Sequence, residues 1–225
     1  MTPDRDVGRI VGVMLLLQLA GFIVPFVMLR PLMSADYFTN VADYSFQIKA
    51  AVLLFFANGA LTIGISIKAW PVFRKYSEPM AIWLIVVSVI MFVLQAVDNV
   101  HIMSMLSLSQ QYVDSGGASN ELYTALAAVV RTTRRWAHYP ELFAIDAWIT
   151  LFGVILLRFA LVPRLLAAFG LLTIVLHFVA VPLSGFLGYG ISTALGVPMA
   201  FGLLANAVWL IAKGFDNEPI SEDFG

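Results

Sequence analysis

Long runs of apolar residues, separated by short polar segments, recur along the whole chain. The runs cover roughly residues 10–29, 47–69, 80–100, 139–159, 165–183 and 192–212. Each run is close to the ~20 residues that a helix needs to cross the ~30 Å hydrocarbon core of a bilayer. The pattern therefore predicts an all-α, polytopic transmembrane bundle of about six spanning helices, forming a single membrane domain over residues 1–225.

One connection between the predicted spans is long enough to hold a helix of its own. Span three can continue as helix to about Ser109, because the first breakers after it are at residues 114–117. Residues 121–137 then contain helix-forming residues without Pro or Gly, and three arginines lie toward the end of this segment. This composition predicts an extra interfacial helix between spans three and four rather than another span.

The composition agrees with a membrane domain. Hydrophobic residues make up 60% of the chain and charged residues only 12%, against about 25% charged residues in soluble domains. The formal net charge of −1 provides no basic face, so nucleic acid is excluded as a partner. The chain has no cysteine, which excludes disulfides and thiol catalysis. The expected partner is the lipid bilayer, and the oligomeric state is left open.

The distribution of Lys and Arg predicts the orientation. Eight basic residues fall on the side of both termini and five on the other side, namely Arg5, Arg9, Lys68, Arg74, Lys75, Arg158, Arg164 and Lys213 against Arg30, Lys49, Arg131, Arg134 and Arg135. The positive-inside rule then places both termini in the cytoplasm. The three clustered arginines outside either contact an anionic ligand or contact lipid head groups.

Ionisable residues inside the predicted spans gather in one layer. Such groups cost a few kcal/mol at depth and need partners. At 1.5 Å per residue, Asp98 and His101 lie about 27 and 31 Å along span three, near the outer edge of the hydrocarbon. His138 and Glu141, at the start of span four, and His177, about 20 Å along span five, fall in the same outer half. All three histidines of the chain are therefore expected in this layer.

Helical phase separates the acidic residues of span four. His138 and Glu141 share a face by their three-residue spacing, whereas Asp146 lies on another face. The two carboxylates are therefore expected to have different partners. His177 shares a face with small and polar residues, so we expect it to point into the bundle.

Neutral polar residues and tryptophans in the spans have a structural interpretation. Gln95 and Asn99 share the face of Asp98 on span three. Side chains expected to form interhelical hydrogen bonds, worth roughly 0.6 kcal/mol each, are Gln18, Asn58, Thr62 and Asn206. Tryptophans near predicted span ends, where an aromatic belt is expected, are Trp70, Trp83, Trp136 and Trp148.

The outer layer has several functional interpretations. The main hypothesis is a pocket for a small molecule or lipid, lined by Asp98, His101, His138, Glu141 and His177 with Arg131, Arg134 and Arg135. A structural alternative is that the carboxylates simply pair with these arginines. A second alternative is a metal or haem site that uses His101, His138 and His177. An intramembrane lipid hydrolase or isomerase is a third, because neighbours such as His138 and Glu141 can form an acid–base pair.

Short motifs in a fixed order carry a resemblance to a known family. They are Gly8-Arg9-Ile10-Val11-Gly12, Tyr76-Ser77-Glu78, Leu108-Ser109-Gln110-Gln111-Tyr112-Val113, Val130-Arg131-Thr132-Thr133-Arg134, His138, Val162-Pro163-Arg164-Leu165-Leu166 and Trp209-Leu210-Ile211-Ala212-Lys213-Gly214-Phe215. In this order the chain resembles a bacterial inner-membrane family known only as domain of unknown function 4386. The resemblance implies a compact bundle in a bacterial cytoplasmic membrane, and it brings no activity, cofactor or partner.

Overall fold

The computed structural model describes residues 3–34, 37–117 and 120–216. Six long helices dominate it: α1 (Pro3–Met28), α3 (Ser45–Phe73), α4 (Glu78–Asp114), α5 (Asn120–Arg158), α6 (Arg164–Leu187) and α7 (Ser192–Lys213). Three short helical turns lie between α1 and α3: η1 (Arg30–Met33), α2 (Tyr37–Asn40) and η2 (Val41–Tyr44). The six long helices carry apolar stretches of spanning length, which confirms the all-α, six-span prediction.

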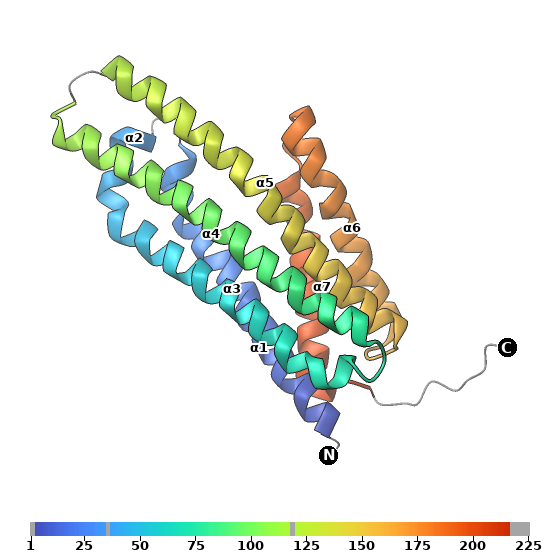
Figure 1. Cartoon of the computed structure of the whole chain (residues 1–225). Helices are drawn as coiled ribbons and strands as arrows, with labels where there is room; N and C mark the ends of the chain where they lie inside the picture. The colour runs from blue at the N-terminus through green and yellow to red at the C-terminus, as the bar shows by residue number, and fades with distance from the viewer. Residues whose placement is uncertain (1–2, 35–36, 118–119, 217–225) are drawn as a thin grey trace.

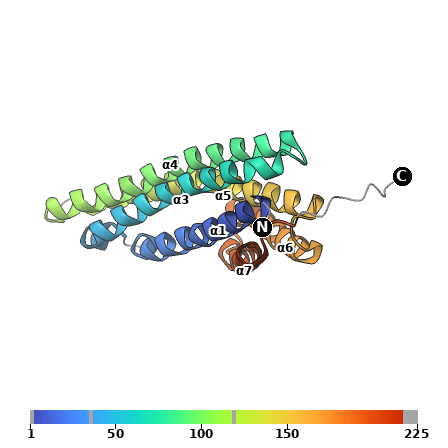
Figure 2. The ribbon, with the colours of Figure 1, turned by 90° about the horizontal axis from the view of Figure 1, so that it is seen from below.

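The long helices form a ring in chain order. Each one packs against the next, and α7 packs against α1. In Figure 2, α4 lies on one side of the ring and α7 on the other. The beginning of α1 and the end of α7 lie together, because Gly8 packs against the backbone of Gly214 and Phe215. We call this the terminal end, and we call the opposite end, which carries α2 and the α4–α5 connection, the distal end (Figure 1).

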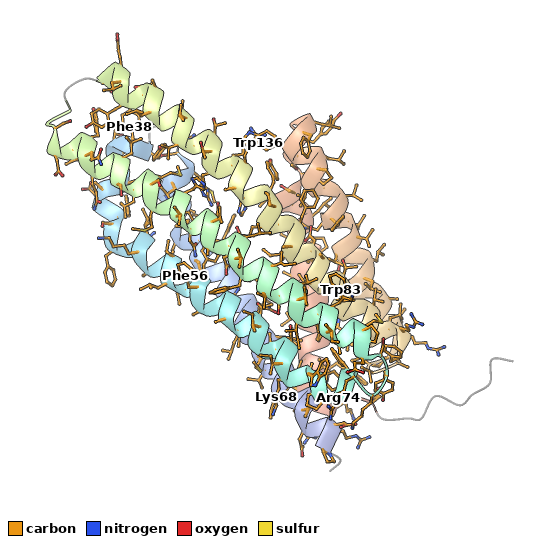
Figure 3. The ribbon with its side chains drawn as sticks, in the orientation of Figure 1. Phe38, Phe56, Lys68, Arg74, Trp83 and Trp136 are labelled. Atoms are coloured by element: carbon orange, nitrogen blue, oxygen red, sulfur yellow. The ribbon has the colours of Figure 1, made fainter. Side chains whose placement is uncertain are left out.

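The outer surface of the bundle is apolar. Large apolar side chains are exposed on each of the six long helices, for example Leu17, Leu53, Val93, Val129, Leu172 and Phe201. Lys68 and Arg74 lie toward the terminal end, whereas Phe38 lies at the distal end (Figure 3). A soluble protein would bury such extensive apolar surface, whereas hydrocarbon solvates it. The chain is therefore a multi-pass membrane protein.

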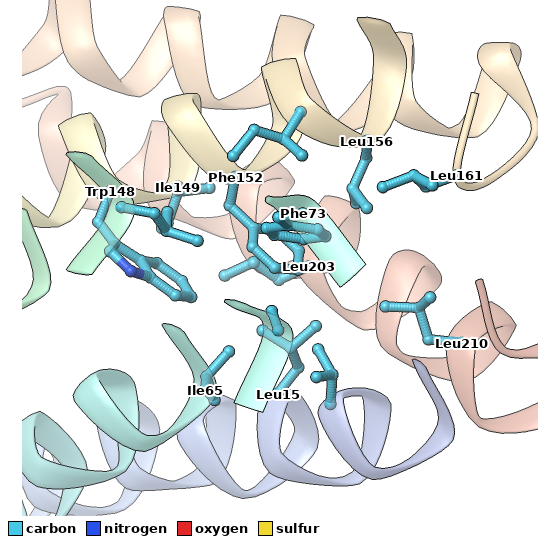
Figure 4. Close-up of a cluster of buried hydrophobic side chains, with 14 of the residues drawn as sticks. Leu15, Ile65, Phe73, Trp148, Ile149, Phe152, Leu156, Leu161, Leu203 and Leu210 are labelled. Carbon is cyan, nitrogen blue, oxygen red and sulfur yellow. The ribbon is translucent and has the colours of Figure 1, made fainter. Parts of the chain in front are cut away.

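A buried apolar cluster holds the terminal half of the ring together. Its side chains come from different helices and include Leu15, Ile65, Phe73, Phe152 and Leu210 (Figure 4). Trp148 belongs to this cluster, is fully buried, and donates its indole N–H to Ser66 Oγ at 2.9 Å.

The prediction that Trp148 lies in the aromatic belt was therefore wrong. The side chain sits on the buried face of α5, where its indole N–H has a hydroxyl acceptor. Trp83 and Trp136, in contrast, are exposed on α4 and α5 and fit a belt. Trp70 is half-buried.

The distal end contains structure that the sequence pattern did not predict. Helices α4 and α5 have 37 and 39 residues, or about 55 and 58 Å at 1.5 Å per residue, so they extend well beyond a ~30 Å hydrocarbon core. Residues 121–137 are helical as expected, but they are the first part of α5 and not a separate interfacial helix. The short turns between α1 and α3 pack beside these extensions in a second apolar cluster that includes Tyr37, Phe38, Val41, Ile102 and Met105.

Candidate functional site

Four ionisable side chains meet where α4 and α5 pack together. Asp98 comes from α4, while Arg134, His138 and Glu141 come from α5, where spacings of four and three residues place them on one face. His138 Nδ1 lies 3.0 Å from Glu141 Oε2 and 3.5 Å from Asp98 Oδ2. Arg134 donates to Asp98 Oδ2 at 3.4 Å. We call these four residues the Asp98 cluster.

The Asp98 cluster is buried on one side and open on the other. Asp98 and Glu141 are 2% and 4% exposed, whereas the His138 side chain is 39% exposed. Among the residues that the structure describes, Asp98 Oδ1 and Arg134 Nε are buried without a hydrogen-bond partner. The cluster therefore has unused hydrogen-bonding capacity inside the protein and one side chain that reaches its surface.

The remaining histidines lie elsewhere. His177 on α6 is buried and lies with its Nδ1 2.7 Å from Asp146 Oδ1 on α5. This agrees with the expectation that His177 points into the bundle and that Asp146 has a partner different from that of Glu141. His101 is half-buried on α4. The structure therefore distributes the three histidines among different surroundings, and within the described ranges the compact group of potential metal ligands comprises Asp98, His138 and Glu141.

The three clustered arginines have separate partners. Arg131 donates to the Ser34 carbonyl and lies over the Tyr37 ring, 5.1 Å from its centroid. Arg135 lies 5.9 Å from the centroid of the Tyr139 ring. Arg134 forms an ion pair with another predicted site residue, Asp98.

A groove of about 480 Å³ lies on the distal side of the Asp98 cluster. Its lining residues come from α3, α4 and α5, and they are Val52, Phe56, Asn99, Val100, Met103, Ser104, Ser107, Leu108, Gln111 and Val130. Val130 precedes Arg134 by one helical turn and Asn99 directly follows Asp98, so the groove and the cluster are neighbours. The volume falls within the range of small-molecule sites.

Of the polar residues that line the groove, Asn99 has a buried side chain without hydrogen-bond partners among the described residues. It is 2% exposed, and neither its amide oxygen nor its amide nitrogen has a hydrogen-bond partner in the described part of the chain. A buried amide left unpaired costs about 1–3 kcal/mol. Asn99 thus offers both a donor and an acceptor beside an apolar wall.

The sequence did not predict this groove, because none of the residues predicted to bind a ligand lines it. Asn99 was recognised as a member of the polar face of span three, whereas Ser104 and Ser107 were not singled out and Gln111 was named only within a family motif. Ser107 and Gln111 continue the four-residue spacing from Asn99. That spacing was the available signal, and it lies beyond the predicted end of the span.

The amides predicted to join helices behave differently from one another. Gln18 donates to Thr62 Oγ1 at 2.6 Å and so links α1 to α3 as expected. Asn206 donates to the Gly202 carbonyl of its own helix at 2.9 Å, so this hydrogen bond does not join two helices as was expected. Both amide atoms of Asn58 lack a partner within the described residues.

Comparison with known proteins gives one match. The family model described as "Domain of unknown function (DUF4386)" matches residues 10–214. None of the curated proteins and none of the solved structures compared with the chain matches it. The geometry of the chain itself is therefore the basis for any functional inference.

Proposed function

The chain belongs to the family described as "Domain of unknown function (DUF4386)", and we propose that it binds an amphipathic lipid or small molecule in the distal groove. In this proposal the protein resides in a bacterial cytoplasmic membrane with both termini in the cytoplasm. The distal end then faces the outer side. The excess of basic residues on the terminal side, eight against five, supports this orientation.

The unpaired, buried amide of Asn99 carries the proposal. A polar group of a ligand that accepts from and donates to this amide removes the cost of leaving it unpaired. Neighbouring hydroxyl and amide groups of Ser104, Ser107 and Gln111 line the same groove. A ligand with several hydrogen-bonding groups at one end suits this set.

The rest of the groove favours an apolar ligand body. Val52 and Phe56 on α3 and Met103 and Leu108 on α4 supply apolar wall. Burial of apolar surface contributes about 25 cal/mol per Å² when the alternative is water. A molecule with a polar head and an apolar body therefore matches the groove better than a small ion or a sugar does.

Native mass spectrometry of the full chain, purified in mild detergent, tests the proposal. The wild type is expected to retain a lipid or small-molecule adduct. Asn99→Leu replaces the amide with an apolar side chain of the same branched shape, and Val100→Trp fills the groove from an exposed position on α4. Both variants are expected to lose the adduct.

Asn206→Leu provides a matched control. Asn206 is also a buried amide within a span, and its Oδ1 also has no hydrogen-bond partner among the described residues. It lies on α7 and lines a cavity of only about 20 Å³ between α5, α6 and α7, which shares no lining residue with the groove. The control is expected to keep the adduct. Equal retention in the wild type, Asn99→Leu and Val100→Trp would contradict the proposal.

A further inference from the structure

We propose that Asp98, His138 and Glu141 form a binding site for a divalent transition-metal ion of the zinc type. The ligand atoms of these three residues lie within 4.8 Å of one another. They provide one imidazole nitrogen and two carboxylate oxygens, a mixed donor set that suits Zn²⁺, Mn²⁺ or Fe²⁺. The proposal does not depend on a ligand in the groove.

Two of the three distances between the ligand atoms are close to those of an occupied site, and the third is at most 4.8 Å. Ligand atoms bound 2.0–2.2 Å from a tetrahedral ion are about 3.3–3.6 Å apart. The distances from His138 Nδ1 to Glu141 Oε2 and Asp98 Oδ2 are 3.0 Å and 3.5 Å. Small side-chain adjustments therefore place an ion between the three residues.

A second observation points to a missing partner of the Asp98 carboxylate. Asp98 is 2% exposed, and its Oδ1 has no hydrogen-bond partner in the described part of the chain. A buried carboxylate normally satisfies both oxygens with hydrogen bonds, a cation or a metal. The His138 side chain, 39% exposed, reaches the surface of the bundle beside this carboxylate.

The charges of the cluster are compatible with a divalent ion. The two carboxylates balance the charge of the ion, and neutral His138 contributes its ring nitrogen. Arg134 remains beside Asp98, and its positive charge, 3.4 Å from Oδ2, weakens the attraction of this carboxylate for a cation. Three protein ligands leave a fourth tetrahedral position for water or another oxygen donor.

The competing interpretation is a structural ion-pair network. In that case Arg134 and a protonated His138 balance Asp98 and Glu141 without a metal. The effect of Arg134 on zinc affinity helps to distinguish the two interpretations. Removing a positive charge 3.4 Å from a ligand oxygen strengthens binding of a cation, so Arg134→Gln is expected to bind zinc more tightly than the wild type.

Titration of the full chain with metal tests the proposal. The protein is purified in mild detergent, stripped with a chelator and titrated with ZnCl₂ by isothermal calorimetry, with MgCl₂ as the comparison ion. The wild type is expected to bind one zinc ion per chain and to show no comparable magnesium binding, because Mg²⁺ prefers oxygen ligands and keeps its waters. Asp98→Asn, His138→Gln and Glu141→Gln are each expected to weaken zinc binding by at least about 10-fold.

The second buried histidine–carboxylate pair supplies the matched control. Asp146→Asn and His177→Gln alter residues of the same chemistry outside the three-ligand group and are expected to retain the wild-type affinity. Each variant is first checked for folding by gel filtration and circular dichroism. In a measurement that requires no variant, Co²⁺ bound to the wild type is expected to give the visible spectrum of a tetrahedral site, and zinc is expected to displace it. A wild type that binds no zinc, or control variants that lose binding as strongly as the ligand variants, would overturn the proposal.

Discussion

His177 Nδ1 lies 2.7 Å from Asp146 Oδ1, between α6 and α5, and both side chains are buried. Removing one partner of a buried ionisable pair leaves the other without compensation, which costs about 3–5 kcal/mol. We therefore expect His177→Ala to lower the free energy of unfolding in detergent by about this amount.

Two further variants make this stability prediction specific. His101→Ala removes a half-buried histidine on α4 and is expected to cost less than about 1 kcal/mol, a typical value for a point substitution. Replacing both members of the pair, with Asp146→Leu and His177→Phe, is expected to recover most of the loss, because apolar replacements of buried pairs are often neutral. If His177→Ala is no more destabilising than His101→Ala, the pair does not stabilise the bundle.

Helices α1 and α7 make close backbone contact at Gly12. A β-carbon at this position would lie 2.7 Å from the backbone nitrogen of Ile211 and 2.8 Å from the carbonyl oxygen of Ala207. Because these two neighbours are backbone atoms, the helices must move apart to make room for the added methyl group. Gly12→Ala is therefore expected to destabilise the protein by about 1–3 kcal/mol. Small residues four apart, as at Gly8 and Gly12, are typical of such contacts in membranes.

Gly64→Ala is the control for this contact. A β-carbon at Gly64 would lie 3.2 Å from the terminal methyl of Met14, a flexible side chain that can move away. The thermal midpoint of this variant is expected to stay near that of the wild type. If Gly12→Ala and Gly64→Ala both have the thermal midpoint of the wild type, the predicted contact between α1 and α7 is wrong.

The orientation of the chain can be tested with reporters. A reporter inserted between Gly116 and Gly117, in the α4–α5 connection, is expected to be external. A reporter after Phe215, and one inserted at Ser77 between α3 and α4, are both expected to be cytoplasmic. The Gly116 and Ser77 insertions must give opposite results, because α4 separates them. Matching results for these two positions would rule out the six-span topology.

The spans could be predicted from the sequence because each apolar run has the length that hydrocarbon requires. The distal end could not, for two physical reasons. Turns of four residues such as α2 are too short to show a helical period. The continuation of helix from Asn120 through Pro140 into the span depends on packing against α4, which a local composition does not reveal.

The sequence indicated the residues of the Asp98 cluster, but it did not show which of the candidate residues lie together. Asp98, His138 and Glu141 stand out because ionisable residues are costly within apolar spans. Depth along each helix placed His177 in the same layer as His138, but the direction of each side chain around the ring decides its partner. His177 thus pairs with Asp146, whereas His138 joins Asp98. The lack of partners for the Asn99 amide was also invisible, because it depends on what α3 and α5 present to it.

A cryo-electron microscopy map of the full chain in lipid nanodiscs tests the central claim, a ligand in the distal groove, most directly. The account predicts elongated density between α3, α4 and α5, with one end within hydrogen-bond distance of the Asn99 amide and the rest along Phe56 and Met103. The same map of Asn99→Leu is expected to lack that density. A wild-type map in which the Asn99 amide bonds to a neighbouring side chain, and protein side chains fill the groove, would contradict the claim.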